Sequence, residues 1–127
     1  MRTLTIQDTI SLHRTLWHWI EQKTLERHVK VELEEYFREN HIPSDEIPNS
    51  KNYCCEYDEQ QLTGWSCENC PFDWQSNCEV SFCYDKEKSF DNNGLLKQWD
   101  AIANDDWKQA AKLARIIAEL PEREHKI

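Results

Sequence analysis

The chain has 127 residues, a formal net charge of −9 and an isoelectric point of about 5.0. This length suits one domain with a buried core, so we expect a single domain over residues 1–127. The acidic charge argues against direct binding to nucleic acid, which needs clustered Lys and Arg. Two glycines, Gly64 and Gly94, cannot build either glycine-rich phosphate-binding loop.

The sequence has no apolar run of the length that a signal peptide or a membrane span requires. We therefore expect a soluble, cytoplasmic protein that does not bind membranes. Because cysteines in a reducing compartment seldom form structural disulfides, the six cysteines of this chain favour metal binding.

Apolar residues recur at helical spacing from Ile6 to Ile20 and predict the first helix. Thr5 and Asp8 form a variant of the capping box at its start. His13 falls on the apolar face and is expected to be a core histidine with one hydrogen bond, not a ligand or a base. The apolar positions cover about half of the helical wheel: Ile6, Ile10, Leu12, Leu16, Trp17, Trp19 and Ile20.

The apolar face changes sides after Gln22, where Leu25 and Val29 lie opposite the first stripe. This change indicates either a helix break near residues 22–25 or one long helix that is covered on different sides along its length. We favour the break, with a second helix that runs to about Asn40. A loop with two prolines follows. The N-terminal helix pair is thus expected over residues 6–40.

All six cysteines lie between residues 51 and 92, a segment without sustained helical or strand periodicity. We expect it to be an irregular loop that something other than an apolar face must order. Leu95, Trp99 and Ile102 then predict a short helix, and a last helix opens near Asp105 and ends before Pro121. The C-terminal helix pair is expected over residues 93–120.

Cys67 and Cys70 form a Cys-x2-Cys turn, the usual first half of a tetrahedral zinc site. The spacings of ferredoxin iron–sulfur clusters are absent, as is the βαβ pattern of a thioredoxin-like redox pair. A structural zinc ion is therefore the leading prediction, with unrelated buried thiols as the simpler reading.

The two remaining zinc ligands are chosen by what they would connect. Cys55, Cys67, Cys70 and Cys78 would tie the loop after the second helix to the segment before the third. The local set that replaces Cys55 with Cys83 would leave the N-terminal part unattached. Cys54 and His41 stay open as substitute ligands.

The segments "CCEYD", "CENCPFDW", "GLLKQWD" and "AAKLARIIAELPER" resemble those of small, uncharacterised cysteine-rich proteins of bacteriophages and prophages in Gram-positive bacteria. The resemblance covers about residues 54–123. The cysteines common in that group match Cys55, Cys67, Cys70 and Cys78, and the resemblance implies a setting inside a bacterial host cell. It implies no reaction.

Tryptophans and acids indicate where a partner could bind. Trp17, Trp99 and Trp107 lie on apolar stripes and are expected in the core, whereas Trp65 and Trp74 flank the Cys-x2-Cys turn and are expected to cover the metal. The stripe of Leu12, Leu16 and Trp19 either packs against two neighbouring helices or forms a partner surface. The acidic candidates for partner binding are Glu34, Glu35, Asp58 and Glu59.

The sequence as a whole predicts a mainly α protein in which an irregular zinc-binding cysteine loop joins two helix pairs. The expected function is non-enzymatic: binding, and inhibition, of a host protein such as a defence or nucleic-acid-handling machine. The alternatives are a zinc-dependent, nuclease-like enzyme, which needs an open coordination position, and a nucleic-acid-binding zinc module, which needs a basic stripe.

Overall fold

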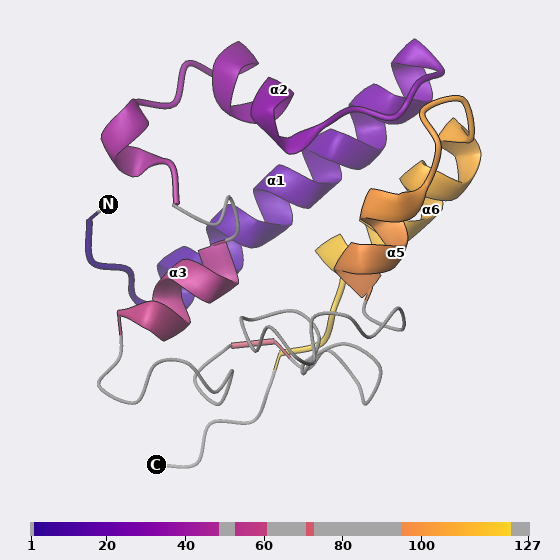
Figure 1. The fold of residues 1–127 in the computed structure, drawn as a ribbon. Coiled ribbons are helices and arrows are strands. Elements are labelled where there is room, and N and C mark those ends of the chain that lie inside the picture. Colours follow the sequence, from indigo (N-terminus) through magenta and orange to yellow (C-terminus); the bar gives the residue numbers. More distant parts are fainter. Residues whose placement is uncertain (1, 49–52, 61–70, 73–94, 123–127) are drawn as a thin grey trace.

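The computed structural model describes residues 2–48, 53–60, 71–72 and 95–122. These ranges are mainly helical and contain no β-strand, apart from one antiparallel bridge between Phe72 and Glu122. The predicted mainly α class is confirmed for them. In chain order the elements are α1 (Ile6–Arg27), α2 (Leu33–Glu39), η1 (Ser44–Glu46), α3 (Tyr53–Glu59), α5 (Leu95–Ala101) and α6 (Trp107–Ala118) (Figure 1).

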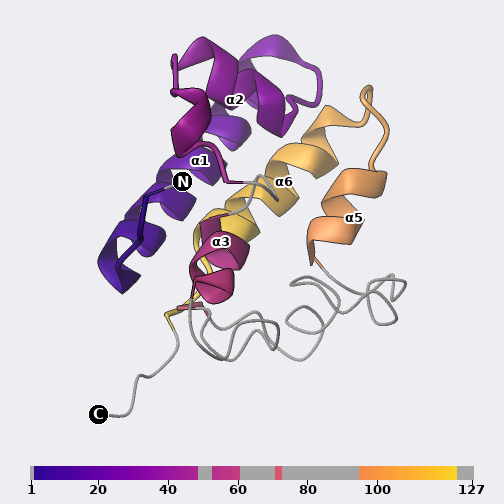
Figure 2. The same ribbon diagram turned by 60° about the vertical axis from the view of Figure 1, so that its left-hand side comes forward.

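The long helix α1 is the centre of the fold and packs against α2, α3 and α6 (Figures 1 and 2). Helix α5 packs on α6. At one end of the α1–α6 pair, His28 stacks on Trp107 with ring centroids 4.5 Å apart, and at the other His13 bonds to Ile117. The two helices therefore run antiparallel.

The side chains between α1 and α6 allow close packing of the two helices. Ala110, Ala114 and Ala118 recur every four residues on α6 and are fully buried. Such a row of small side chains lets two helix backbones approach closely. Trp17 fills the space beside it, 1% exposed and edge-on to Trp99 at 5.0 Å, so the core positions expected for these two tryptophans are confirmed.

The predicted helix break at residues 22–25 is wrong, because α1 continues to Arg27 and ends at His28 in the left-handed region (φ 56°). The helix continues through the polar residues whose positions suggested a break. Thr24 is fully buried, and its hydroxyl accepts the backbone N–H of Val31 at 3.2 Å. That bond folds the chain back onto α1 one turn after the helix ends.

The second helix, α2, ends at Glu39, close to the predicted end near Asn40. The third, α3, is a helix in a segment that we expected to be irregular. Its seven residues are too short to show a sequence period, yet Tyr53, Cys54 and Tyr57 are buried in the core. Gln60, just after α3, anchors the N-terminal segment: its side chain accepts from Leu4 N–H at 2.7 Å.

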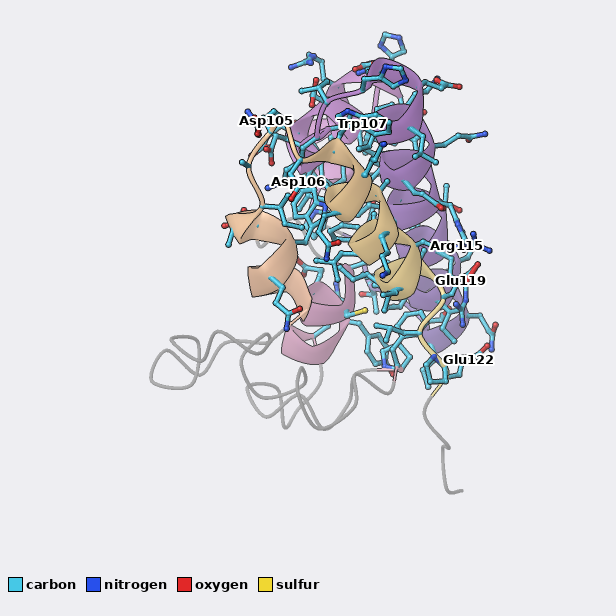
Figure 3. All side chains as sticks on the ribbon, turned by 90° about the vertical axis from the view of Figure 1, so that its right-hand side faces the viewer. Asp105, Asp106, Trp107, Arg115, Glu119 and Glu122 are labelled. Atoms are coloured by element: carbon cyan, nitrogen blue, oxygen red, sulfur yellow. The ribbon has the colours of Figure 1, made fainter. Side chains whose placement is uncertain are left out.

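The predicted C-terminal helix pair is confirmed as α5 and α6. Asp105 and Asp106 precede the first turn of α6, where a negative charge favours the helix dipole (Figure 3). Trp107 is half-buried by its stack on His28 and is not fully in the core. Across the described ranges, no helix combines the length and apolar character needed to cross a bilayer.

Candidate metal centre and partner surface

Most of the predicted zinc ligands lie outside the described residues. This holds for Cys67, Cys70 and Cys78, and also for the side chain of Cys55, whose backbone belongs to α3. Among the described residues, no three or more His, Cys, Asp or Glu side chains form a group that could hold a metal ion. The zinc site at these four cysteines therefore stays a prediction.

Two potential metal-binding side chains do meet in the described part of the chain, where α3 packs on α1. Cys54 Sγ lies 3.4 Å from His13 Nδ1. Cys54 is 0% exposed and His13 is 1% exposed, and the cysteine is not in a disulfide. An imidazole and a thiol thus face each other in a site that excludes water.

The protonation of the His13 ring follows from its other contact. His13 Nε2 lies 2.8 Å from the carbonyl oxygen of Ile117, which can only accept a hydrogen bond, so Nε2 carries the proton. Burial lowers the pKa of His13 to about 4, against the opposing effect of that hydrogen bond. The ring is therefore neutral at pH 7, and Nδ1 directs a lone pair at Cys54.

The carbonyl that fixes His13 belongs to the end of α6, where helix carbonyls lack intrahelical donors. Arg14, the next residue along α1, donates to the carbonyls of Ala118 at 2.8 Å and Leu120 at 3.0 Å. Its guanidinium also lies 3.8 Å from Glu122, which Figure 3 shows beyond the end of α6. Two consecutive residues of α1 thus cap α6 and hold His13 in one orientation.

Phe72, in the middle of the cysteine segment, contacts the same histidine. Its ring is 0% exposed, with its centroid 4.3 Å from that of the His13 ring and 5.0 Å from Arg14 Cζ. The backbone bridge to Glu122 fixes it from the other side. Cys70 precedes Phe72 by two residues and Cys55 follows Cys54, so neighbours of two proposed ligands meet at His13.

The His13–Cys54 pair resembles a catalytic cysteine and histidine in composition but not in setting. A nucleophilic cysteine needs a lowered thiol pKa and access for its substrate. Here both side chains are shielded from solvent, and a histidine whose pKa is about 4 is a weak base at pH 7. The arrangement suits a fixed hydrogen bond or a bound metal better than nucleophilic attack.

A surface of different character lies where α1 meets α2. Trp19 is half-buried, edge-on to Tyr36 at 5.4 Å, with Arg27 Cζ 5.7 Å from its ring centroid. Arg27 donates to Glu39 at 2.9 Å and lies 3.8 Å from Glu35. The hydrogen bond from Arg27 lowers the pKa of Glu39, which keeps it charged. We call Trp19, Arg27, Glu34, Glu35 and Glu39 the α1–α2 surface.

The predicted partner residues differ in how far they are exposed. Leu16 is 1% exposed and belongs to the core, so direct contact with a partner is wrong for this residue. Leu12 and Trp19 pack against the core with part of their surface accessible, so their contacts are compatible with both helix packing and a partner surface. Glu34 is exposed on α2, whereas the side chains of Asp58 and Glu59 lie outside the described residues.

The sequence placed His13 correctly in the core but missed its partner. Cys54 was only a substitute for its neighbour Cys55, because the loop expected around both gave no reason to place either thiol on α1. The pair of adjacent cysteines was the available signal, since only one of two neighbours on a helix can point at a given face. His41, the other substitute ligand, is exposed after α2 with φ 53°.

No family model matches this chain, and neither the curated proteins nor the solved structures compared with it give a match.

Proposed function

We propose that this chain is a phage-type binding protein that uses the α1–α2 surface to bind, and thereby inhibit, a host protein that handles nucleic acid or acts in defence. A structural zinc ion orders its cysteine segment. The observation that carries the proposal is the accessible Trp19, held between Tyr36 and Arg27 and bordered by carboxylates.

This composition is typical of binding surfaces. Trp, Tyr and Arg are the residues most enriched among interface hot spots. Trp19 and Arg27 are also fixed before any partner arrives, by the ring contact and by the ion pairs with Glu35 and Glu39. Such preorganisation reduces the entropy that binding costs.

The negative charge of the chain supports a partner with a basic surface. With a formal net charge of −9, the protein attracts basic surfaces over a distance of about one Debye length, roughly 8 Å at physiological salt. Grooves that bind nucleic acid are basic, so an acidic protein with an aromatic anchor is suited to occupy one. Binding in such a groove would itself be inhibitory.

The zinc proposal is supported by the Cys67–Cys70 turn and by two described parts of the cysteine segment. Phe72 and α3 both contact His13 of α1; Cys55 belongs to α3, and Cys70 precedes Phe72 by two residues. A metal ion bound by these cysteines would link α3 to the residues before Phe72, next to the helix α1 that both already contact.

The test begins with affinity purification, in which the immobilised protein captures its partner from a lysate of a Gram-positive host. Binding of the purified partner is then measured. The surface variant combines Glu34→Lys, Asp58→Lys and Glu59→Lys with Glu35→Gln. Glutamine is used because Glu35 accepts the N–H of Glu32 at 2.7 Å in the capping box of α2, which Gln can maintain. We expect slower association and a weaker salt dependence, with an unchanged circular dichroism spectrum.

Trp19→Ala tests the aromatic anchor, and Glu119→Lys is the control, since Glu119 is exposed at the opposite end of α6 (Figure 3). We expect Trp19→Ala to weaken binding at least tenfold, as hot-spot truncations do, and Glu119→Lys to leave it unchanged. A partner that binds both variants as tightly as the unaltered protein would contradict the assignment of this surface.

A further inference from the structure

We propose that a pocket formed by the N-terminal segment, α1, η1 and α3 receives a lysine side chain of the partner protein. The pocket is lined by Arg2, Leu12, Ile42, Glu46 and Tyr53. The inference rests on the proposed function and extends its binding surface. Leu12 and Trp19 are seven residues apart on α1, so the pocket and the aromatic anchor lie on the same face of the helix, roughly 10 Å from each other.

The size of the pocket selects the kind of ligand. Its volume is about 60 Å³, whereas pockets for drug-sized ligands measure about 300–1,000 Å³. The pocket therefore has room for the end of one side chain. Leu12 and Ile42 supply an apolar wall, on which the methylene stem of a lysine can pack while its ammonium group stays near water. The slim stem of lysine suits this space better than the planar guanidinium of arginine.

The charged groups at the pocket favour a cation. The side chain of Glu46 is 47% exposed, and its ion pair with Arg2 is long, with 4.0 Å between the carboxylate and Nε. Arg2 instead donates a hydrogen bond to Asp8 at 3.2 Å. The Glu46 carboxylate can thus accept a closer hydrogen bond from a lysine ammonium group than it receives from Arg2.

Tyr53 supplies a second acceptor for that ammonium group. The residue is 2% exposed, and no described residue forms a hydrogen bond with its hydroxyl. Burial raises the pKa of Tyr53 to about 12, so the hydroxyl is neutral at pH 7. The charges of Glu46 and Arg2 also act on this pKa, which places the hydroxyl within range of both groups. A lysine bound to Glu46 would therefore reach the Tyr53 hydroxyl as well.

The walls of the pocket are fixed before a ligand arrives. Gln60 holds the N-terminal segment by donating from Nε2 to the Arg2 carbonyl at 2.9 Å. After α2, the N–H of Ile42 donates to the Phe37 carbonyl at 3.0 Å, and the Phe37 ring is edge-on to Tyr53 with centroids 6.2 Å apart. A preformed pocket of this kind loses little conformational entropy when a side chain enters it.

An NMR titration of the full-length protein with Nα-acetyl-lysine methylamide tests the pocket without the partner. We expect saturable chemical-shift changes at the methyl groups of Leu12 and Ile42, with a dissociation constant of about 10 mM. The norleucine analogue keeps the stem and lacks the ammonium group, so it should bind at least about threefold more weakly, as a partly exposed ion pair allows. The inference is overturned by unsaturated shifts up to about 100 mM, by equal affinity for the norleucine analogue, or by tighter binding of the arginine analogue.

Adjacent acids of η1 provide a matched pair of variants. Glu46→Gln should abolish the preference for lysine over norleucine. Asp45→Asn should keep it, because Asp45 is exposed and does not line the pocket. Arg2→Gln should strengthen lysine binding, since it removes the cation that competes for Glu46. Weaker lysine binding by Arg2→Gln would contradict recognition of a cation at this pocket.

The purified partner separates this inference from the proposed function. Glu46→Gln should weaken its binding at least about threefold, and Asp45→Asn should not. Equal losses for the two variants would show that net charge attracts the partner and that the pocket holds no lysine. If Trp19→Ala still weakens binding in that case, the α1–α2 surface stands and only the pocket is lost. If the lysine analogue binds but Trp19→Ala has no effect, the reverse holds.

Discussion

Lys30 is the most deeply buried charged side chain in the described part of the molecule, with 2% of the side chain exposed. Its ammonium group donates to the carbonyls of Asp100 at 3.0 Å and Ile102 at 3.2 Å, at the end of α5. It also lies 4.3 Å from the centroid of the Trp99 ring. Because buried charges need such partners, Lys30 acts as a C-terminal cap of α5 supplied by a distant part of the chain.

Replacing Lys30 with methionine should therefore destabilise the fold although the apolar stem is kept. Two carbonyls would lose their donor, at a cost of about 2 kcal/mol in the free energy of unfolding. Chemical denaturation followed by tryptophan fluorescence measures this loss. Lys112→Met is the control, since Lys112 is exposed on α6 and should change stability little. Equal free energies of unfolding for the two variants would show that the hydrogen bonds of Lys30 do not stabilise the fold.

The helix α1 shows which features of an element the sequence determines. Its start was predicted, because the capping box of Thr5 and Asp8 depends on residues only three positions apart in the sequence. Its end was not, because the N–H of Val31 that satisfies buried Thr24 comes from the chain that folds back. The short helix α3 was missed for a similar reason: its order depends on packing against α1.

The N-terminal cap of α1 makes a prediction for that element. Thr5 Oγ1 accepts the backbone N–H of Asp8 at 3.0 Å, and loss of this bond in Thr5→Ala should cost about 1 kcal/mol. Thr15→Ala is the matched control, since Thr15 is exposed in the same helix and alanine there favours the helix slightly. Thermal unfolding of both variants gives the comparison, and a Thr5→Ala protein as stable as Thr15→Ala would contradict the role of the cap.

The other half of the capping box is sensitive to acid. Hydrogen bonds from the backbone and side chain of Thr5 hold the pKa of Asp8 below its ordinary value of 3.8. The stabilisation is thus fully present above pH 3.8 and is lost as the pH falls through the lower pKa of the folded state. Asp8→Asn should flatten the dependence of unfolding free energy on pH in that window. An unchanged slope below pH 4 would show that Asp8 titrates alike in both states.

For the whole molecule, the fold class followed from periodicity, whereas the buried contact of His13 with Cys54 did not. The segments with apolar stripes, at residues 6–20 and 107–118, are those that became the central helix pair. The His13–Cys54 contact joins residues 41 positions apart and depends on how α3 packs, which no spacing in the sequence encodes. A contact between side chains of separate helices can be identified only once the positions of those helices in the fold are known.

The charge of the whole chain predicts that it does not bind DNA at physiological salt. A net charge of −9 leaves few phosphates that the chain could neutralise, so little counterion release would drive binding. Gel shifts with duplex and single-stranded DNA at about 150 mM salt should show no complex below about 10 μM protein, which places any affinity in the weaker half of the range of non-specific binding or beyond it. Salt-sensitive complexes at sub-micromolar protein would instead support the nucleic-acid-binding module.

Removal of zinc should separate the molecule into a part that needs the metal and a part that does not. The α1–α6 pair buries Trp17, Ile20, Ala114 and Ile117 without any metal contact, so its packing should outlast chelation. Structural zinc contributes roughly 10 kcal/mol or more to the order of the segment that it holds. In hydrogen exchange with and without a zinc chelator, we therefore expect amides of α3 and Phe72 to lose protection while those near Ile20 keep it.

The extent of that loss also shows how much of the fold the metal holds. If Cys55 is a ligand, chelation should loosen the contact between α3 and α1, and protection should fall at Tyr53 and Tyr57, which are buried on α3. Re-addition of zinc should restore it, with Cys67→Ser as the variant that cannot respond. Loss of protection throughout α1 would show that the metal holds the entire fold, because the α1–α6 core would then be too weak to persist alone.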